Sequence, residues 1–219
     1  MDVHSPAPRS EVNSRRPLVF GLGNPGPRYA DTRHNVGWRV VETLAKRWRA
    51  RETRPGPVYR SWQAERNGQI VDLVVPLMLM NRSGAALAAW MALHGLAREE
   101  LLVVSDDVYL PLEMLRFRPR GSSGGHRGLE SIERALAGRE WARLRLGVGA
   151  ADDAGAGLQV GVPAELREHV LETFGPDEKD RAEKMIARGA DAVECWLDEG
   201  PESVMNRFNR RATREVQEP

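Results

Sequence analysis

The sequence predicts an α/β fold, a single domain in which a mixed, twisted β-sheet is flanked by helices. Short apolar segments typical of buried strands alternate along the 219 residues with segments of helical periodicity. The dipeptide Asn67-Gly68 joins two neighbouring strand segments and is a strong hairpin signal, so the sheet should contain antiparallel as well as parallel pairs. A chain of this length with 41% hydrophobic residues can bury one sizeable core.

The elements of the N-terminal half follow in order. Residues 17–22 (PLVFGL) form an apolar run that ends in a turn, which predicts a buried strand. Apolar residues then recur at helical spacing from Val36 to Trp48, and Thr32 is a suitable N-cap near the start of that helix. The next three elements are expected to be strands at 58–66 and 69–75 and a helix at 83–94.

The C-terminal half continues the alternation. An apolar strand is expected at 101–104, with Asp106 and Asp107 directly after it. Residues 150–163 form a loop of small residues and are a candidate lid. The remaining expected elements are strands at 113–118 and 143–149 and helices at 129–136, 164–173 and 177–199.

Polar segments border this domain at both ends. We expect residues 1–16 to be a disordered tail, 17–208 to be the folded domain and 209–219 to be a polar C-terminal tail. No apolar run approaches eighteen residues, so no membrane span is predicted, and the first sixteen residues lack a secretory apolar run. The one cysteine, Cys195, can form no internal disulfide and is expected in the core, which favours a reducing, cytoplasmic location.

The net charge of +1 conceals an uneven distribution of charge. From Arg15 to Arg60 there are eleven basic residues against three acids, whereas from Glu165 to Glu202 there are twelve acids against five bases. Nearly all the basic residues are arginines, whose planar fork suits phosphate contacts. Two interpretations stay open at this stage, solvated helix faces and a half of the protein that faces nucleic acid.

The segment GLGNPG at 21–26 has the GxGxxG spacing of a dinucleotide-binding site, but its context disfavours that function. Pro25 and Pro27 prevent the chain from entering a regular helix there, and the helical periodicity begins only near Asn35. Where an acid should hold the ribose hydroxyl groups, residues 46–51 read KRWRAR. This turn instead presents polar side chains at the carboxyl end of a strand, the edge where open α/β sheets bind ligands.

Five motifs follow one another along the chain: GLGNPGPRYADTRHNVG at 21–37, MNRSG at 80–84, DDVYLP at 106–111, GSSGGHRGL at 121–129 and RLRLGVG at 143–149. In sequence and separation they resemble the bacterial-type peptidyl-tRNA hydrolase family, from about Leu18 to Phe208. The resemblance implies hydrolysis of the ester between a peptide and the 3' ribose of tRNA. It also implies recycling of peptidyl-tRNA released prematurely from ribosomes, without metal or cofactor, by a monomer with no obligatory protein partner.

The same resemblance assigns roles to residues by position. His34 would be the catalytic base that activates water, Asp106 its orienting partner, and Asn24 and Asn81 the amides that position the substrate. The other implied contacts are Tyr29, Met80 and Arg127 around the peptide and the CCA end, and Arg118 and Arg145 on the phosphate of the acceptor stem.

The residue types suit this chemistry independently. Histidine, with an unperturbed pKa of about 6.5, is largely neutral at pH 7 and can accept a proton, and the start of a helix disfavours its charged form. A carboxylate such as Asp106 can fix the histidine tautomer, and amide donors such as Asn24 can stabilise an oxyanion. Taken singly, Asn24 could equally be a turn residue, Asp106 a loop cap and His34 a surface residue.

Some positions depart from the family. Arg127 stands where the family usually has Asn; a guanidinium can donate hydrogen bonds but cannot accept one from water. Ser105 and Tyr109 replace a frequent His and a frequent acid, and for His126 a purely structural role stays open. Two other functions are therefore kept as alternatives, a non-catalytic RNA-binding module and a hydrolase of small esters.

Overall fold

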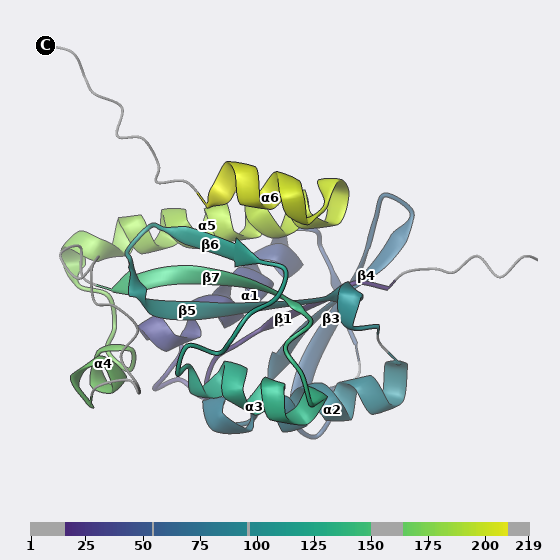
Figure 1. The fold of residues 1–219 in the computed structure, drawn as a ribbon, viewed down its shortest axis with the longest axis horizontal. Helices are drawn as coiled ribbons and strands as arrows, with labels where there is room; N and C mark the ends of the chain where they lie inside the picture. Colours follow the sequence, from purple (N-terminus) through teal and green to yellow (C-terminus); the bar gives the residue numbers. More distant parts are fainter. Residues whose placement is uncertain (1–15, 54, 96, 150–163, 210–219) are drawn as a thin grey trace, which may run out of the picture.

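A seven-stranded mixed sheet forms the centre of the described protein, in the order β2-β3-β4-β1-β5-β7-β6 (Figure 1). The computed structural model describes residues 16–209 except 54, 96 and 150–163. Strands β4, β1, β5 and β7 run parallel, while β2, β3 and β6 pair antiparallel with their neighbours. The strands are β1 (Leu18–Gly21), β2 (Arg51–Glu52), β3 (Tyr59–Arg66), β4 (Gln69–Pro76), β5 (Leu101–Pro111), β6 (Leu115–Arg118) and β7 (Ala142–Gly149).

Helices cover both faces of this sheet. In Figure 1, α5 and α6 lie above the sheet and α2 and α3 below it, with α4 near one end. The helices are α1 (Val36–Arg47), α2 (Ser83–His94), α3 (Arg127–Leu136), α4 (Ala164–His169), α5 (Pro176–Glu199) and α6 (Pro201–Phe208). Short 3-10 turns are η1 (Arg33–Asn35), η2 (Met80–Arg82) and η3 (Arg98–Glu100). The predicted single α/β domain with a mixed sheet is confirmed.

The apolar core has two layers because successive strand residues point to opposite faces. Val19 packs with α1, α5 and α6, whereas Leu18 and Phe20 pack with α2 and α3. All three side chains are fully buried, and burial of each stabilises the fold by about 1.5 to 3 kcal/mol. Coverage of both faces explains why β1 reads as a continuous apolar run instead of an alternating one.

Gly21, the first glycine of the GxGxxG spacing, and Gly37 allow close packing of α1. A Cβ atom on Gly21 would lie 2.4 Å from the carbonyl oxygen of Gly37, and one on Gly37 would lie 2.3 Å from that of Val104. Helix α1 therefore approaches β1 and β5 through backbone contacts that leave no space for side chains. Gly26 adopts a φ of 101°, which favours glycine in the turn after Pro25.

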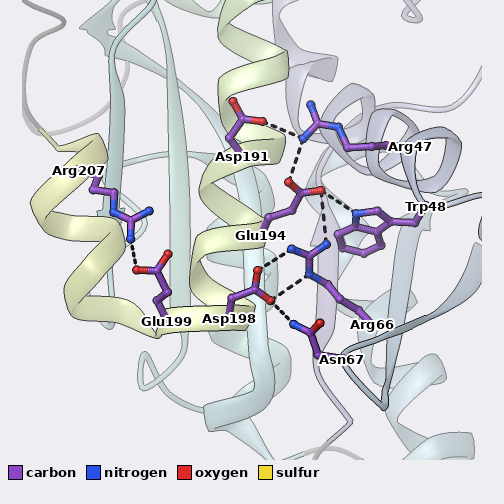
Figure 2. A network of polar contacts seen from close by, with 9 residues as sticks. All are labelled: Arg47, Trp48, Arg66, Asn67, Asp191, Glu194, Asp198, Glu199 and Arg207. Atoms are coloured by element: carbon purple, nitrogen blue, oxygen red, sulfur yellow. Dashed lines mark hydrogen bonds and ion pairs between the residues drawn. The ribbon is translucent and has the colours of Figure 1, made fainter.

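Ion pairs fasten α5 to α1 and to the β3–β4 hairpin (Figure 2). Arg47 of α1 lies 2.8 Å from Asp191, and Glu194 accepts a hydrogen bond from the indole of Trp48 at 2.7 Å. In the same network Arg66 and Asn67 each bind Asp198, and Arg207 of α6 pairs with Glu199 at the end of α5. Within the basic stretch 15–60, Arg33, Arg39 and Arg47 pair with acids of α5, which supports the interpretation as paired helix faces for these three residues.

The structure differs from the predictions at strand β5 and at the expected cap of α1. Strand β5 continues to Pro111 instead of ending at 104, because β7 pairs with it across a register shift after Asp107. Asp106 and Asp107 therefore lie within a strand, and the prediction that they follow it was wrong. The hydroxyl of Thr32 donates to the carbonyl oxygen of Tyr29 at 2.8 Å and caps no helix.

Both ends of the domain extend slightly beyond expectation. Helix α6 was not predicted, and Asn209, assigned to the C-terminal tail, exchanges two hydrogen bonds with the backbone of Phe117 in β6. Arg16, assigned to the N-terminal tail, forms an ion pair with the buried Asp72. The predicted lid at 150–163 and the remaining tail residues lie outside the described residues.

Candidate active site

A pocket of about 540 Å³ opens at the carboxyl edge of β1 and β5. Its walls come from the turn after β1, from η1, η2, β5 and the Gly-rich loop with α3, and from α4 with the residues after it. Every predicted site residue except Arg118 lines it: Asn24, Tyr29, His34, Met80, Asn81, Asp106, Arg127 and Arg145. Residues from five separate motifs therefore meet at one site.

Two histidines share one oxygen of Asp106. His34 Nδ1 and His126 Nε2 each lie 2.8 Å from Asp106 Oδ1, and only 2% of the carboxylate side chain is exposed. Burial raises the pKa of the Asp106 carboxyl, but the two histidines together hold it well below its ordinary value. Asp106 is thus ionised and can only accept, so both ring nitrogens donate to it.

The start of α3 fixes the tautomer of His126. Its Nδ1 accepts from the backbone N–H of Gly128 at 3.1 Å and of Leu129 at 3.2 Å, so this side chain is the N-cap of α3. An accepting Nδ1 carries no proton, and the remaining proton must lie on Nε2, facing Asp106. His126 is a member of the site to which sequence reasoning gave no catalytic role; the available signals were its place in the motif GSSGGHRGL and just before a helix start.

His34, Asp106 and His126 also present three donor atoms within 4.8 Å of one another, a spacing that could hold a metal ion. Coordination through His126 Nε2 would require the proton to move to Nδ1, where it would oppose the two N–H groups of α3. The donor set is therefore arranged as a hydrogen-bonded network, and a metal fits it poorly.

The side chain of Asn24 is fixed through its oxygen, so its Nδ2 group can donate into the pocket. Its Oδ1 accepts from the backbone N–H of Met80 at 2.7 Å, which leaves the Nδ2 group to donate at the pocket wall. Asn35 fixes the backbone of Asn24 through two hydrogen bonds of 2.9 Å, one to its N–H and one to its carbonyl oxygen. Asn81 lies exposed on the same side, one residue beyond Met80.

A second carboxylate, Asp107, pairs with Arg145. Arg145 Nε lies 3.0 Å from Asp107 Oδ2, although not at the angle of a hydrogen bond, and Asp107 Oδ1 accepts from the N–H of Tyr109. Burial raises the pKa of Asp107 above its ordinary value, and the nearby Asp106 charge adds to this, against the attraction of Arg145. Arg145 is therefore a paired cation at the pocket wall, whereas Arg127 is exposed at the start of α3.

Strands β6 and β7 carry four arginines on one face. Cross-strand pairing places Arg116 opposite Arg145 and Arg118 opposite Arg143. Arg118 is exposed and lies beyond the pocket lining, while Arg143 is buried against Trp141 with its guanidinium 3.7 Å from a ring centre. Burial lowers the pKa of Arg143 to about 10. Sequence reasoning did not assign Arg116, because only strand register shows that it faces Arg145.

An ionised carboxylate that orients a histidine, beside amide donors at the edge of an α/β sheet, is an arrangement typical of hydrolytic enzymes. Comparison with known proteins gives the family. The family model for peptidyl-tRNA hydrolase matches residues 18–217. Peptidyl-tRNA hydrolases of Methylacidiphilum infernorum and Chloroflexus aggregans are 41% and 42% identical to this chain, over 88% of its length and 97% and 98% of theirs.

Solved structures agree. The crystal structure of peptidyl-tRNA hydrolase from Acinetobacter baumannii has a TM-score of 0.78 and 29% sequence identity, and the match covers 90% of this chain and 95% of that one. The chain therefore belongs to the peptidyl-tRNA hydrolase family, a family of enzymes that act on a tRNA substrate. Across the described residues, no helix is long and apolar enough to cross a membrane.

Proposed function

We propose that this enzyme hydrolyses the ester between a peptide and the 3' ribose of tRNA, with His34 as the general base. One observation carries the assignment: the ionised Asp106 accepts from His34 Nδ1 at 2.8 Å. Because that nitrogen keeps its proton, the other ring nitrogen, Nε2, holds the lone pair that removes a proton from water. General-base catalysis of this kind contributes roughly 10²- to 10⁴-fold to a rate.

As water attacks, negative charge develops on the carbonyl oxygen of the ester, and hydrogen-bond donors are required to stabilise it. Asn24 offers its Nδ2 group from a fixed orientation, and Asn81 and Arg127 offer further donors from neighbouring walls. One preorganised donor of this kind is worth about 2.7 to 4 kcal/mol in the transition state. Tyr29 and Met80 border the place where the peptide and the CCA end meet.

Arg118 and Arg145 would bind a phosphate of the acceptor stem, on the face of β6 and β7 beside the pocket. Phosphate contacts carry no base sequence, which suits an enzyme that accepts peptidyl-tRNAs of every type. In the cell we place this activity in the cytoplasm, where a monomer would recycle peptidyl-tRNA released prematurely from ribosomes.

The test is release of N-acetyl-aminoacyl groups from tRNA, with chelator present, by the wild type and by His34→Ala. His94→Ala is the matched control, because His94 is an exposed histidine at the end of α2 and does not line the pocket. We expect cleavage by the wild type and the control and its loss in His34→Ala. Substantial turnover by a folded His34→Ala variant would contradict the general-base assignment, and tRNA binding without wild-type cleavage would favour a non-catalytic RNA-binding protein.

A further inference from the structure

Arg33 is buried directly beside the proposed general base. Only 7% of its side chain is exposed, and it does not line the pocket, whereas His34 does. The two neighbours in η1 therefore project to different sides, His34 into the pocket and Arg33 into the body of the protein. Arginine is almost never buried without partners, so its contacts indicate its role.

The guanidinium of Arg33 joins η1 to the start of α5. Its Nη1 donates to the carbonyl oxygen of Thr173, its Nη2 donates to Glu178, and its centre lies 5.0 Å from the ring centre of Phe174. Glu178 also accepts from the backbone N–H of Gly175 at 2.8 Å. Burial raises the pKa of Glu178, but the Gly175 hydrogen bond and Arg33 bring it below its ordinary value, so the partner of Arg33 is an ionised carboxylate.

Residues 170–173, which accept a hydrogen bond from the Arg33 side chain, also bind the backbone of His34. The N–H of His34 donates to the carbonyl oxygen of Val170 at 2.8 Å, and the N–H of Arg33 donates to that of Glu172 at 3.0 Å. The ring of His34 is held separately by Asp106. The imidazole is thus fixed from two directions, by a carboxylate at the ring and by residues 170–174 at the backbone.

We propose that Arg33 is a positioning residue that holds His34 in place by tying η1 to the start of α5, an inference that rests on the proposed function. The Nε of Arg33 is buried without a hydrogen-bond partner among the described residues, which lowers the contribution of this arginine to stability. The main effect of Arg33 is therefore on the position of η1 and not on stability. Without it, η1 can shift against α5, and a displacement of about 1 Å at a catalytic group can cost on the order of 10²-fold in rate.

The experiment compares Arg33→Met with Arg39→Met. Arg39 is a matched control, because it also pairs with an acid of α5, Glu183, but stands away from the pocket. We expect Arg33→Met to lower kcat by at least about tenfold with KM within about twofold, because the tRNA contacts lie elsewhere. Arg39→Met should keep kcat within about twofold, because Arg39 lies away from the pocket and pairs with an exposed acid. Equal losses of kcat in the two variants would overturn the proposal.

The position of His34 can be read directly from the NMR signal of its Nδ1 proton, which forms the hydrogen bond to Asp106. We expect this signal to shift or broaden in Arg33→Met and to persist in Arg39→Met; an unchanged signal in both would overturn the proposal. If Arg33→Met fails to fold, Glu178→Gln provides the test. We expect this variant to lose less kcat than Arg33→Met would, and an unchanged kcat would overturn the inference. An active His34→Ala would contradict the general base itself, whereas an inactive His34→Ala beside a fully active Arg33→Met would overturn only the role of Arg33.

Discussion

His126 Nε2 donates to Asp106 Oδ1 over 2.8 Å, while the opposite ring nitrogen of the same histidine caps helix α3. The cap fixes which nitrogen carries the proton, and that proton helps to keep the carboxylate ionised and oriented. A residue that sequence comparison left without a role thus links the stability of a helix to the proposed orientation of the general base.

His126→Asn should separate these two roles. The shorter amide can still accept from the N–H groups of α3, so the variant should keep the cap, which is worth about 1 kcal/mol, but it cannot reach Asp106. We expect kcat to fall about tenfold or more at nearly unchanged stability, measured by peptidyl-tRNA cleavage and thermal unfolding. His126→Ala should lose both stability and activity. Wild-type kcat in a folded His126→Asn variant would show that the contact with Asp106 has no part in catalysis.

Asp107→Asn should change the pH dependence of stability. The pKa of Asp107 is raised in the fold. Its contribution to the free energy of unfolding is therefore favourable below the ordinary pKa of 3.8 and is lost as pH rises through the folded pKa. An amide keeps an acceptor for the N–H of Tyr109 but carries no charge. The difference in melting temperature between variant and wild type should therefore become more positive from pH 3 to pH 7. A difference that is constant or falls with pH would contradict this.

Replacing Arg118 or Arg145 by Ala should raise KM in both cases but should lower stability only for Arg145. Arg118 is exposed, so its loss should raise KM for peptidyl-tRNA and reduce the salt slope by about one, without loss of stability. Loss of Arg145 should in addition destabilise the fold, because it leaves the buried Asp107 unpaired. Combining Arg145→Gln with Asp107→Asn should restore stability but not KM. If neither KM nor its salt dependence changes, the proposed phosphate contact is wrong.

Arg127→Asn restores the residue usual in the family. Arg127 is exposed at the start of α3, so the exchange should leave stability unchanged. We expect kcat to stay within about threefold of wild type, because Asn24 still supplies a fixed donor. The measurement is steady-state cleavage of N-acetyl-aminoacyl-tRNA. Complete loss of activity would instead make Arg127 a catalytic donor particular to this chain.

Much of the site could be predicted from sequence because each motif contains the residue types of its chemistry. Asn24, His34 and Asp106 were assigned from the resemblance of their motifs to the family, and all three line the pocket. Asp107 was noticed beside Asp106, but its pairing with Arg145 depends on strand register and burial. The role of Arg33 was equally hidden, since its partners Thr173 and Glu178 lie about 140 residues further along the chain.

The sequence by itself determined the α/β class, most of the order of the elements and the family, because hydrophobic periodicity, turn residues and motif spacing are local properties of the chain. Only the tertiary structure decided how far β5 extends, which tautomer His126 adopts and which arginines face the pocket. The physical reason is that pairing register, burial and hydrogen-bond direction depend on atoms contributed by distant segments, and these set both the charge state of Asp106 and the position of the histidine beside it.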